Sequence, residues 1–276
     1  MPGNLAALRL QVETALAGRV AAPFTYWDRK LVEMVSAGVP EIDALTGGLP
    51  RGGLTEICGP PYSGRTSLLV SALASRTAQA EVCALVDGRD AFDPHGAAAA
   101  GVELKQLLWV RCRNIEQALR STDLLLQGGG FGMIAVDLSD IPAATVRYVP
   151  LNAWFRFRRA VEDTPTILML LEQEANAKTC ASLVLRVGFE APRWTGAARE
   201  VGDFCVANSS GCLLEGVGVR AEVVRSSVQP IGGGAVGVDG SVGVFETRRG
   251  DGLAFAEADA EETDTAISNF RISDFK

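Results

Sequence analysis

The stretch LTEICGPPYSGRTSLLVSALASRTA, residues 54–78, decides the fold of this chain. Its first residues, LTEIC, are mostly apolar, which is typical of a buried β-strand. The glycine- and proline-rich segment GPPYSGRT (residues 59–66) marks a tight loop, and the apolar residues after it recur at helical spacing. The stretch therefore predicts a strand that runs through a glycine-rich loop directly into a helix.

The loop matches the phosphate-binding pattern G-x-x-x-x-G-K-[ST] except at the lysine position, which holds Arg65. In that pattern, backbone N–H groups surround a phosphate at the helix N-terminus, where the helix dipole favours anions. Arginine keeps the positive charge but is longer and planar. The predicted nucleotide-binding residues are Gly59, Pro60, Pro61, Tyr62, Ser63, Gly64, Arg65, Thr66 and Ser67. The alternative interpretation is a glycine-rich turn with no ligand.

A magnesium site is predicted beside this loop, so that ATP and Mg²⁺ are the expected cofactors. Thr66 would supply a hydroxyl to the metal, and Asp137, at the end of an apolar strand, would supply a carboxylate. An isolated aspartate at a strand end can also cap the next turn. Asp137 is therefore predicted as a metal ligand only because the glycine-rich loop is present as well.

The rest of the sequence predicts an α/β fold, a doubly wound and mostly parallel sheet. Strands are predicted at residues 81–87, 107–112, 132–140 and 166–173, and helices at residues 96–107, 114–127 and 154–162. This alternation is typical of parallel βαβ crossovers. Two later stretches, residues 182–189 and 218–227, alternate with a period of two and predict antiparallel strands at the sheet edge.

Three parts are predicted along the chain: a short N-terminal helix with a linker (1–37), a core domain (38–228), and a linker with an acidic tail (229–276). From residue 251 onward the tail carries seven acidic and two basic residues. Its last ten residues, ISNFRISDFK, regain apolar side chains. They are interpreted either as a frayed end or as a peptide that docks on a partner.

Composition places limits on function and location. The formal charge of −7 argues against a surface covered in nucleic-acid-binding charge, although a local basic stripe stays compatible with it. The six cysteines form no C-x-x-C pair, and buried, reduced thiols are expected. There is no signal-peptide pattern and no apolar run of roughly 18 residues. We therefore expect a cytoplasmic protein with no membrane span, and leave nucleoid association open.

Residues 38 to about 228 resemble the RecA recombinase family. GVPEIDALTGGLPRGGLTEICGPPYSGRTSL (residues 38–68) is similar to the family's segment leading into its phosphate-binding loop. VDGRDAFDP resembles a family block built on D-A-E-H-A-L-D-P, MIAVDLSD carries the second acidic motif, and VRAEVVRSS resembles a late T-R-V-K-V-V-K strand. LLEQ lies where the family ends a strand in Asn-Gln, which makes Gln173 the nucleotide sensor by resemblance. The resemblance also implies an N-terminal helix that packs on its own core or on a neighbouring subunit of a homo-oligomer.

The departures from that family all affect its known activities. Arg89 occupies the position of the family's water-activating glutamate, and a guanidinium cannot act as a general base. Asp90 is adjacent, but we expect its side chain to point elsewhere. The DNA-binding loops expected after Asp140 and after Gln173 are shorter than the family's, and its C-terminal domain is not found. This pattern resembles the degenerate RecA-like ImuA family, which works with a Y-family polymerase homologue and other damage-tolerance proteins in mutagenic lesion bypass.

One predicted helix interleaves aromatic and basic side chains, a composition that suits single-stranded DNA. Its candidate DNA-binding residues are Arg156, Arg158 and Arg159. The alternative is that Trp154 and Phe157 pack inward while the arginines are solvated. His95 is the only histidine, which excludes a histidine-based triad or metal site.

Three functions follow as hypotheses. The first is a RecA-like accessory protein of DNA repair and damage-induced mutagenesis (SOS response, translesion synthesis) with weak or no ATP hydrolysis. The second is an active DNA-dependent ATPase recombinase, and the third is a nucleotide-independent interaction module. Arg89 and the short loops favour the first over the second. The retained glycine-rich loop favours the first over the third.

Overall fold

The computed structural model describes residues 31–194, 214–230 and 240–248. The chain separates into two units, Met1–Leu31 and Val32–Lys276, and the second contains the sheet described below. The predicted N-terminal helix, two of the cysteines (Cys205 and Cys212) and the acidic tail lie outside the described residues.

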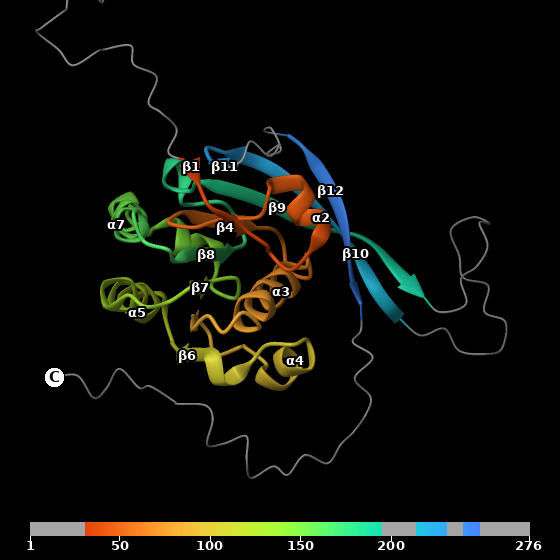
Figure 1. Ribbon diagram of the computed structural model, residues 1–276, viewed down its shortest axis with the longest axis horizontal. Helices are drawn as coiled ribbons and strands as arrows, with labels where there is room; N and C mark the ends of the chain where they lie inside the picture. The colour runs from red at the N-terminus through yellow and green to blue at the C-terminus, as the bar shows by residue number, and fades with distance from the viewer. Residues whose placement is uncertain (1–30, 195–213, 231–239, 249–276) are drawn as a thin grey trace, which may run out of the picture. The chain divides into compact units, whose positions relative to one another are not determined.

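Helices and strands alternate along most of the described chain (Figure 1). The helices are α2 (Pro40–Thr46), α3 (Arg65–Thr77), α4 (Pro94–Ala99), α5 (Ile115–Gly128), α6 (Ala143–Arg147) and α7 (Leu151–Val161), with short 3-10 helices η1 (Leu104–Gln106) and η2 (Lys178–Cys180). The strands of the main sheet are β4 (Leu54–Cys58), β5 (Cys83–Asp87), β6 (Leu107–Arg111), β7 (Met133–Asp137), β8 (Ile167–Glu172), β9 (Leu183–Trp194), β10 (Leu214–Ser226) and β12 (Val242–Arg248). Four short strands complete the set: β1 (Leu31–Val32), β2 (Met34–Val35), β3 (Leu49–Pro50) and β11 (Gln229–Pro230).

The main sheet has eight strands in the order β12-β10-β9-β4-β8-β7-β5-β6. Strands β6, β5, β7, β8, β4 and β9 pair in parallel, whereas β9, β10 and β12 pair antiparallel. The chain leaves β4 for β5 and β6, returns through β7 and β8, and reaches β9 on the other side of β4. The predicted α/β fold, mostly parallel with antiparallel strands at one edge, is confirmed.

Helices cover both faces of the parallel part of the sheet (Figure 1). On one face, Ile57 of β4 belongs to a core that includes buried side chains of α2, α3 and α4. On the other face, Leu54 of the same strand belongs to a core that includes α5 and α7, with Trp154 and Phe157 fully buried. Because successive strand residues point to opposite faces, the apolar run of a strand such as β4 is buried on both sides.

Two predicted element boundaries differ from the structure. The helix expected over residues 96–107 is shorter, because α4 ends at Ala99 and Gly101 has a φ of +95°, which ends helical geometry. The linker predicted after residue 228 contains β12, which pairs with β10 and buries Phe245. Glycines surround this strand in the sequence, and its alternating apolar pattern is too short to predict a strand by itself. It forms a strand because it pairs with β10.

The described cysteines Cys58, Cys83, Cys112 and Cys180 are buried and free of disulfides, which confirms the prediction for these four. Burial raises the pKa of the Cys58 thiol to about 11 and that of the Cys83 thiol to about 12. Both thiols are therefore protonated at neutral pH and unreactive. No helix within the described ranges has the length and apolar character needed to cross a membrane.

Candidate nucleotide site

The glycine-rich loop joins β4 to α3 at the carboxyl edge of the sheet, where ligands bind in open α/β folds. The loop backbone lies tightly against the antiparallel strands. A methyl group at Gly59 would lie 2.2 Å from the carbonyl oxygen of Val187, and one at Gly64 would lie 2.6 Å from a methyl of Val219. Gly64 also has a φ of +88°, so glycine is required there on two grounds.

The loop offers features that fit a phosphate group. The helix that follows it, α3, begins at Arg65 and has 13 residues, so its dipole is directed at the loop. The Ser63 hydroxyl is buried in the loop without a hydrogen-bond partner among the described residues. Tyr62 stands out from the loop, with a φ of +62° and a side chain that is 94% exposed. A bound anion would give the Ser63 hydroxyl the partner that it lacks.

Arg65 is held inside the protein by the next strand. Its Nη1 donates a 2.6 Å hydrogen bond to the backbone carbonyl of Glu172, at the end of β8, and the residue is only 6% exposed. Burial lowers the pKa of the Arg65 guanidinium, and the nearby charges of Asp137 and Asp140 act in the opposite direction. The cation is thus already partly neutralised by the protein. A phosphate would compete with the Glu172 carbonyl for Nη1, while the other N–H groups of the guanidinium have no hydrogen bond to a described residue.

Asp137 ends β7 beside the loop, as predicted. One of its carboxylate oxygens accepts hydrogen bonds from the backbone N–H of Ser139, at 2.9 Å, and from the Ser139 hydroxyl. Burial raises the pKa of Asp137, and the hydrogen bonds from Ser139 oppose that change. No hydrogen bond from a described residue reaches the second oxygen, and Thr66 at the start of α3 is exposed. No group of three or more potential metal-ligating acidic, cysteine or histidine residues lies in the described part of the chain. A magnesium ion here would therefore depend on Thr66, Asp137 and the phosphates themselves.

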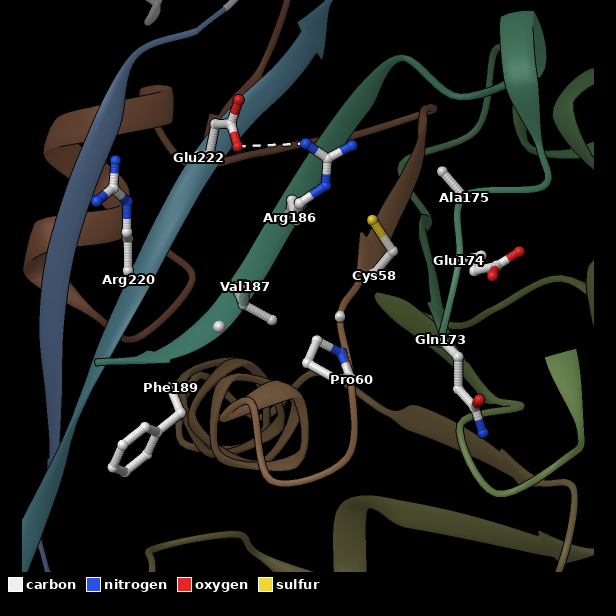
Figure 2. A pocket seen from close by; sticks show the side chains of 12 residues that line it. Cys58, Pro60, Gln173, Glu174, Ala175, Arg186, Val187, Phe189, Arg220 and Glu222 are labelled. Carbon is white, nitrogen blue, oxygen red and sulfur yellow. Dashed lines mark hydrogen bonds and ion pairs between the residues drawn. The ribbon is translucent and has the colours of Figure 1, made fainter. Parts of the chain in front are cut away.

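Gln173, which directly follows β8, connects the end of that strand to the end of β7. Its Nε2 donates a 2.9 Å hydrogen bond to the carbonyl of Ser139, two residues after Asp137. The side chain also lines an open pocket of about 400 Å³ between the loop and β9–β10. Figure 2 shows Gln173 on one side of this pocket and the ion-paired Arg186 and Glu222 on the other. The structure thus brings the loop, Asp137 and Gln173 to one edge of the sheet.

Asp87 is a site residue that the sequence analysis did not single out. It ends β5 directly opposite Asp137 of β7. Its carboxylate accepts hydrogen bonds from the backbone N–H groups of Arg89 and Phe92 and from the indole of Trp109. Those bonds fix the turn after β5. A strand-terminal aspartate in VDGRD was visible in the sequence, but its partner Trp109 comes from β6 and could not be predicted from that segment.

Arg89 and Asp90 follow in this turn, and both are exposed. Both carboxylate oxygens of Asp90 are bound by the Arg111 guanidinium, at 2.5 and 2.6 Å. The hydrogen bond to Arg111 is the main cause of a lowered pKa at Asp90, so this group is a weak base. The expectation that Asp90 does not replace a missing base is consistent with this geometry.

The arginines of α7 lie on its outer surface, while Trp154 and Phe157 pack inward. Arg156 forms a 2.9 Å ion pair with Asp123 of α5, and Arg158 donates to the Thr179 carbonyl at 3.1 Å. Arg159 is exposed. The inward packing of Trp154 and Phe157 is therefore observed, while DNA binding by the exposed arginines stays a prediction. The structure does not bring these arginines to the glycine-rich loop's pocket, whose lining contains none of them.

Comparison with known proteins agrees with the fold and the loop. Residues 15–147 match the RecA N-terminal domain family. The chain is 41% identical over 108 residues to "Protein RecA" of Psychrobacter cryohalolentis and to "Protein RecA" of Psychrobacter arcticus. It is 40% identical over 108 residues to "Protein RecA" of Ectopseudomonas oleovorans. Each alignment covers 38% of this chain and 31% of the relative, so the chain matches about a third of the length of these curated relatives.

The similarity and the geometry point to the same part of the chain. The matched region contains the glycine-rich loop and the strand that ends at Asp137, and in the structure these lie at one edge of a RecA-like parallel sheet. Over residues 15–147 the chain is therefore similar to the RecA N-terminal domain family, and this similar region carries the glycine-rich loop and Asp137.

Proposed function

We propose that this protein is a RecA-like accessory factor of DNA repair and damage-induced mutagenesis, closest in kind to the ImuA family. In this role it binds ATP and Mg²⁺ weakly, hydrolyses ATP slowly or not at all, and acts in the cytoplasm through contacts with a Y-family polymerase homologue. The observation that carries the proposal is a retained phosphate loop combined with a cation, Arg65, that the protein itself has engaged. Such a loop keeps a binding shape without the free charge that ATP turnover requires.

Nucleotide, when bound, is expected on residues 59–67 with Thr66 and Asp137 at the metal. Thr66→Ala removes a metal-ligating hydroxyl and should weaken Mg²⁺-ATP binding about tenfold, measured by calorimetric titration. Ser71→Ala, later in the same helix, is the matched control and should bind as the wild type does. Equal affinities for the wild type and Thr66→Ala would place the nucleotide elsewhere.

Single-stranded DNA binding is proposed as weak. Arg156 and Arg158 already have partners within the protein, so a phosphate would compete with Asp123 and with the Thr179 carbonyl.

Self-association through the N-terminal helix is also part of the proposal. An active strand-exchange recombinase is the second candidate, supported by the similarity to RecA over residues 15–147.

The partner contact is proposed for the C-terminal segment ISNFRISDFK, which lies outside the described residues. A short apolar string after an acidic spacer suits folding on binding to a groove. Deleting residues 263–276 should abolish capture of a Y-family polymerase homologue in a pull-down. The thermal midpoint of the core should change by less than about 2 °C, because the sheet keeps its contacts. Unchanged capture would move the interface to the body of the protein.

A further inference from the structure

Two buried glutamates lie behind the candidate site, on the neighbouring strands β4 and β8. Glu56 of β4 and Glu172 of β8 are both 0% exposed. In the parallel pairing, Glu56 lies opposite Leu170 and Cys58 lies opposite Glu172. Because side chains alternate along strands, the two carboxyl groups project from the same face of neighbouring strands, one diagonal step apart. They are therefore close neighbours inside an apolar core.

Both carboxyl groups bind the same short segment that follows β8. Oε1 of Glu56 accepts the backbone N–H groups of Asn176, at 2.5 Å, and Ala177, at 2.9 Å. Oε2 of Glu172 accepts Nδ2 of Asn176 at 2.7 Å. The segment Gln173–Ala177 is thus fastened to the sheet by two glutamates from two strands.

The other two oxygens of the pair are left without partners. Oε2 of Glu56 and Oε1 of Glu172 are buried and have no hydrogen-bond partner among the described residues. Two ionised carboxylates with an unsatisfied oxygen each would be strongly unfavourable at such a position. A proton on either of these oxygens would remove one charge and supply a donor.

The surrounding charges do not neutralise the pair. Arg225 of β10 favours the ionised form of Glu56, but burial is the larger effect and raises the pKa of that group. Burial first, and then the charge of Glu56, raise the pKa of Glu172 to about 8. Arg65 gives its N–H to the main-chain carbonyl of Glu172, and the pKa of the neighbouring Cys58 thiol is about 11, which keeps it neutral.

Other cations on the adjoining elements have partners of their own. Arg186 of β9 is paired with Glu222, and Arg158 of α7 binds the Thr179 carbonyl. Arg147, which ends α6, is paired with Glu174 at 2.7 Å.

We propose that Glu56 and Glu172 bind a single proton between them, and that this proton holds the segment Gln173–Ala177 on the sheet. With the proton present, one carboxyl group is neutral and the other accepts the segment's N–H groups. When the proton is lost, two like charges face each other in a dry core. The structure relieves that repulsion by releasing Asn176 and Ala177, so that water reaches both carboxylates.

Release of the segment would be felt at the glycine-rich loop. The carbonyl that binds Arg65 belongs to Glu172 itself, and Gln173 is bound to the carbonyl of Ser139. Figure 2 shows Gln173, Glu174 and Ala175 together along one side of the pocket beside the loop. Loss of the proton therefore changes the position of the Glu172 carbonyl and, with it, that of Arg65. This effect requires neither nucleotide nor DNA.

The sign of the pH dependence follows from the raised pKa values. When the segment is released, water reaches both glutamates and each has the ordinary pKa of about 4.3. Between that pH and about 8, the open state therefore lacks the proton that the closed state keeps. The closed state is fully favoured at low pH and is lost as the pH rises toward about 8, where the pKa of Glu172 lies. Above that pH both states are ionised and the dependence levels off.

Amide hydrogen exchange of the full chain, followed at Asn176 and Ala177 by NMR and corrected for the intrinsic exchange rate, tests the proposal. Between about pH 5 and about pH 7 the opening constant should rise roughly a hundredfold, close to tenfold for each pH unit, because opening releases one proton. A rise of less than about threefold in the unmodified chain would overturn it.

Matched variants separate the pair from its surroundings. Glu172→Gln keeps an oxygen for Asn176 but cannot ionise, so the hundredfold rise should fall to less than about threefold. Glu174→Gln changes an exposed carboxylate on the same segment and should keep the full rise. A Glu172→Gln protein that retains the full rise would contradict the proposal. If that variant does not fold, the unmodified chain decides the question, because a rise of less than about threefold there already overturns the proposal.

Discussion

ATP turnover by the unmodified protein is expected to stay near the uncatalysed background, with or without single-stranded DNA. Arg89 stands where the resemblance to RecA requires a water-activating glutamate, and general-base catalysis contributes about 10²–10⁴-fold in rate. Arg89 is exposed in the turn after β5, so a carboxylate can be placed there without repacking the core. Arg89→Glu should therefore raise turnover by up to about 10²-fold, measured as phosphate release at saturating Mg²⁺-ATP.

Arg89→Gln is the matched control for this change. It removes the arginine without supplying a base, and turnover should remain at background. Asp90→Asn tests the neighbouring carboxylate, which is bound on both oxygens by Arg111 and should be irrelevant to the rate. A turnover on the order of 1 s⁻¹ in the unmodified protein, within the ordinary range of enzymes, would show that another residue serves as the base and would favour the recombinase.

The second large effect is expected from Gly59→Ala, at the start of the loop. The new methyl group would lie 2.2 Å from the Val187 carbonyl oxygen and 2.8 Å from the Ser63 hydroxyl. A backbone atom cannot rotate out of the way, so β9 must move away from β4 or the loop must change shape. Overpacking of this kind costs about 3 kcal/mol. For a domain of this size that corresponds to a fall of roughly 6–12 °C in the thermal midpoint.

Gly188→Ala provides the comparison for this variant. Gly188 follows Val187 on β9, and a methyl group there meets no atom within 4 Å. Its stability should stay within about 0.5 kcal/mol of the unmodified protein, as is usual for substitutions on an open surface. Similar midpoints for both variants, measured by calorimetry, would mean that the loop and β9 are not packed together as described.

The elements that the sequence predicted correctly depend on interactions between residues close together in the chain. The apolar run of β4, the glycines after it and the helical spacing after Thr66 predict a strand, a loop and a helix, because each depends on residues adjacent in the chain. The position of Asp137 at a strand end follows in the same way. The replacement of a lysine by Arg65 is also evident from the sequence, and it raised the question of whether the loop is still active.

Elements that depend on pairing were harder to predict. The strand β12 has few residues and glycine-rich surroundings, and its identity depends on β10, a partner distant in sequence. DNA binding by α7 stays a prediction, but the structure adds that Arg156 contacts Asp123 of α5 and that Arg158 contacts the Thr179 carbonyl. Neither partner is visible from the helix itself.

The α/β fold, the glycine-rich loop and the arginines at positions 65 and 89 could all be predicted from the amino-acid sequence. The contacts of those residues depend on the folded sheet. It bound Arg65 to the Glu172 carbonyl, placed Asp87 opposite Asp137, and enclosed Glu56 with Glu172. The physical reason is that pKa values and hydrogen-bond partners depend on burial and on neighbours from distant strands, which only the folded sheet brings together.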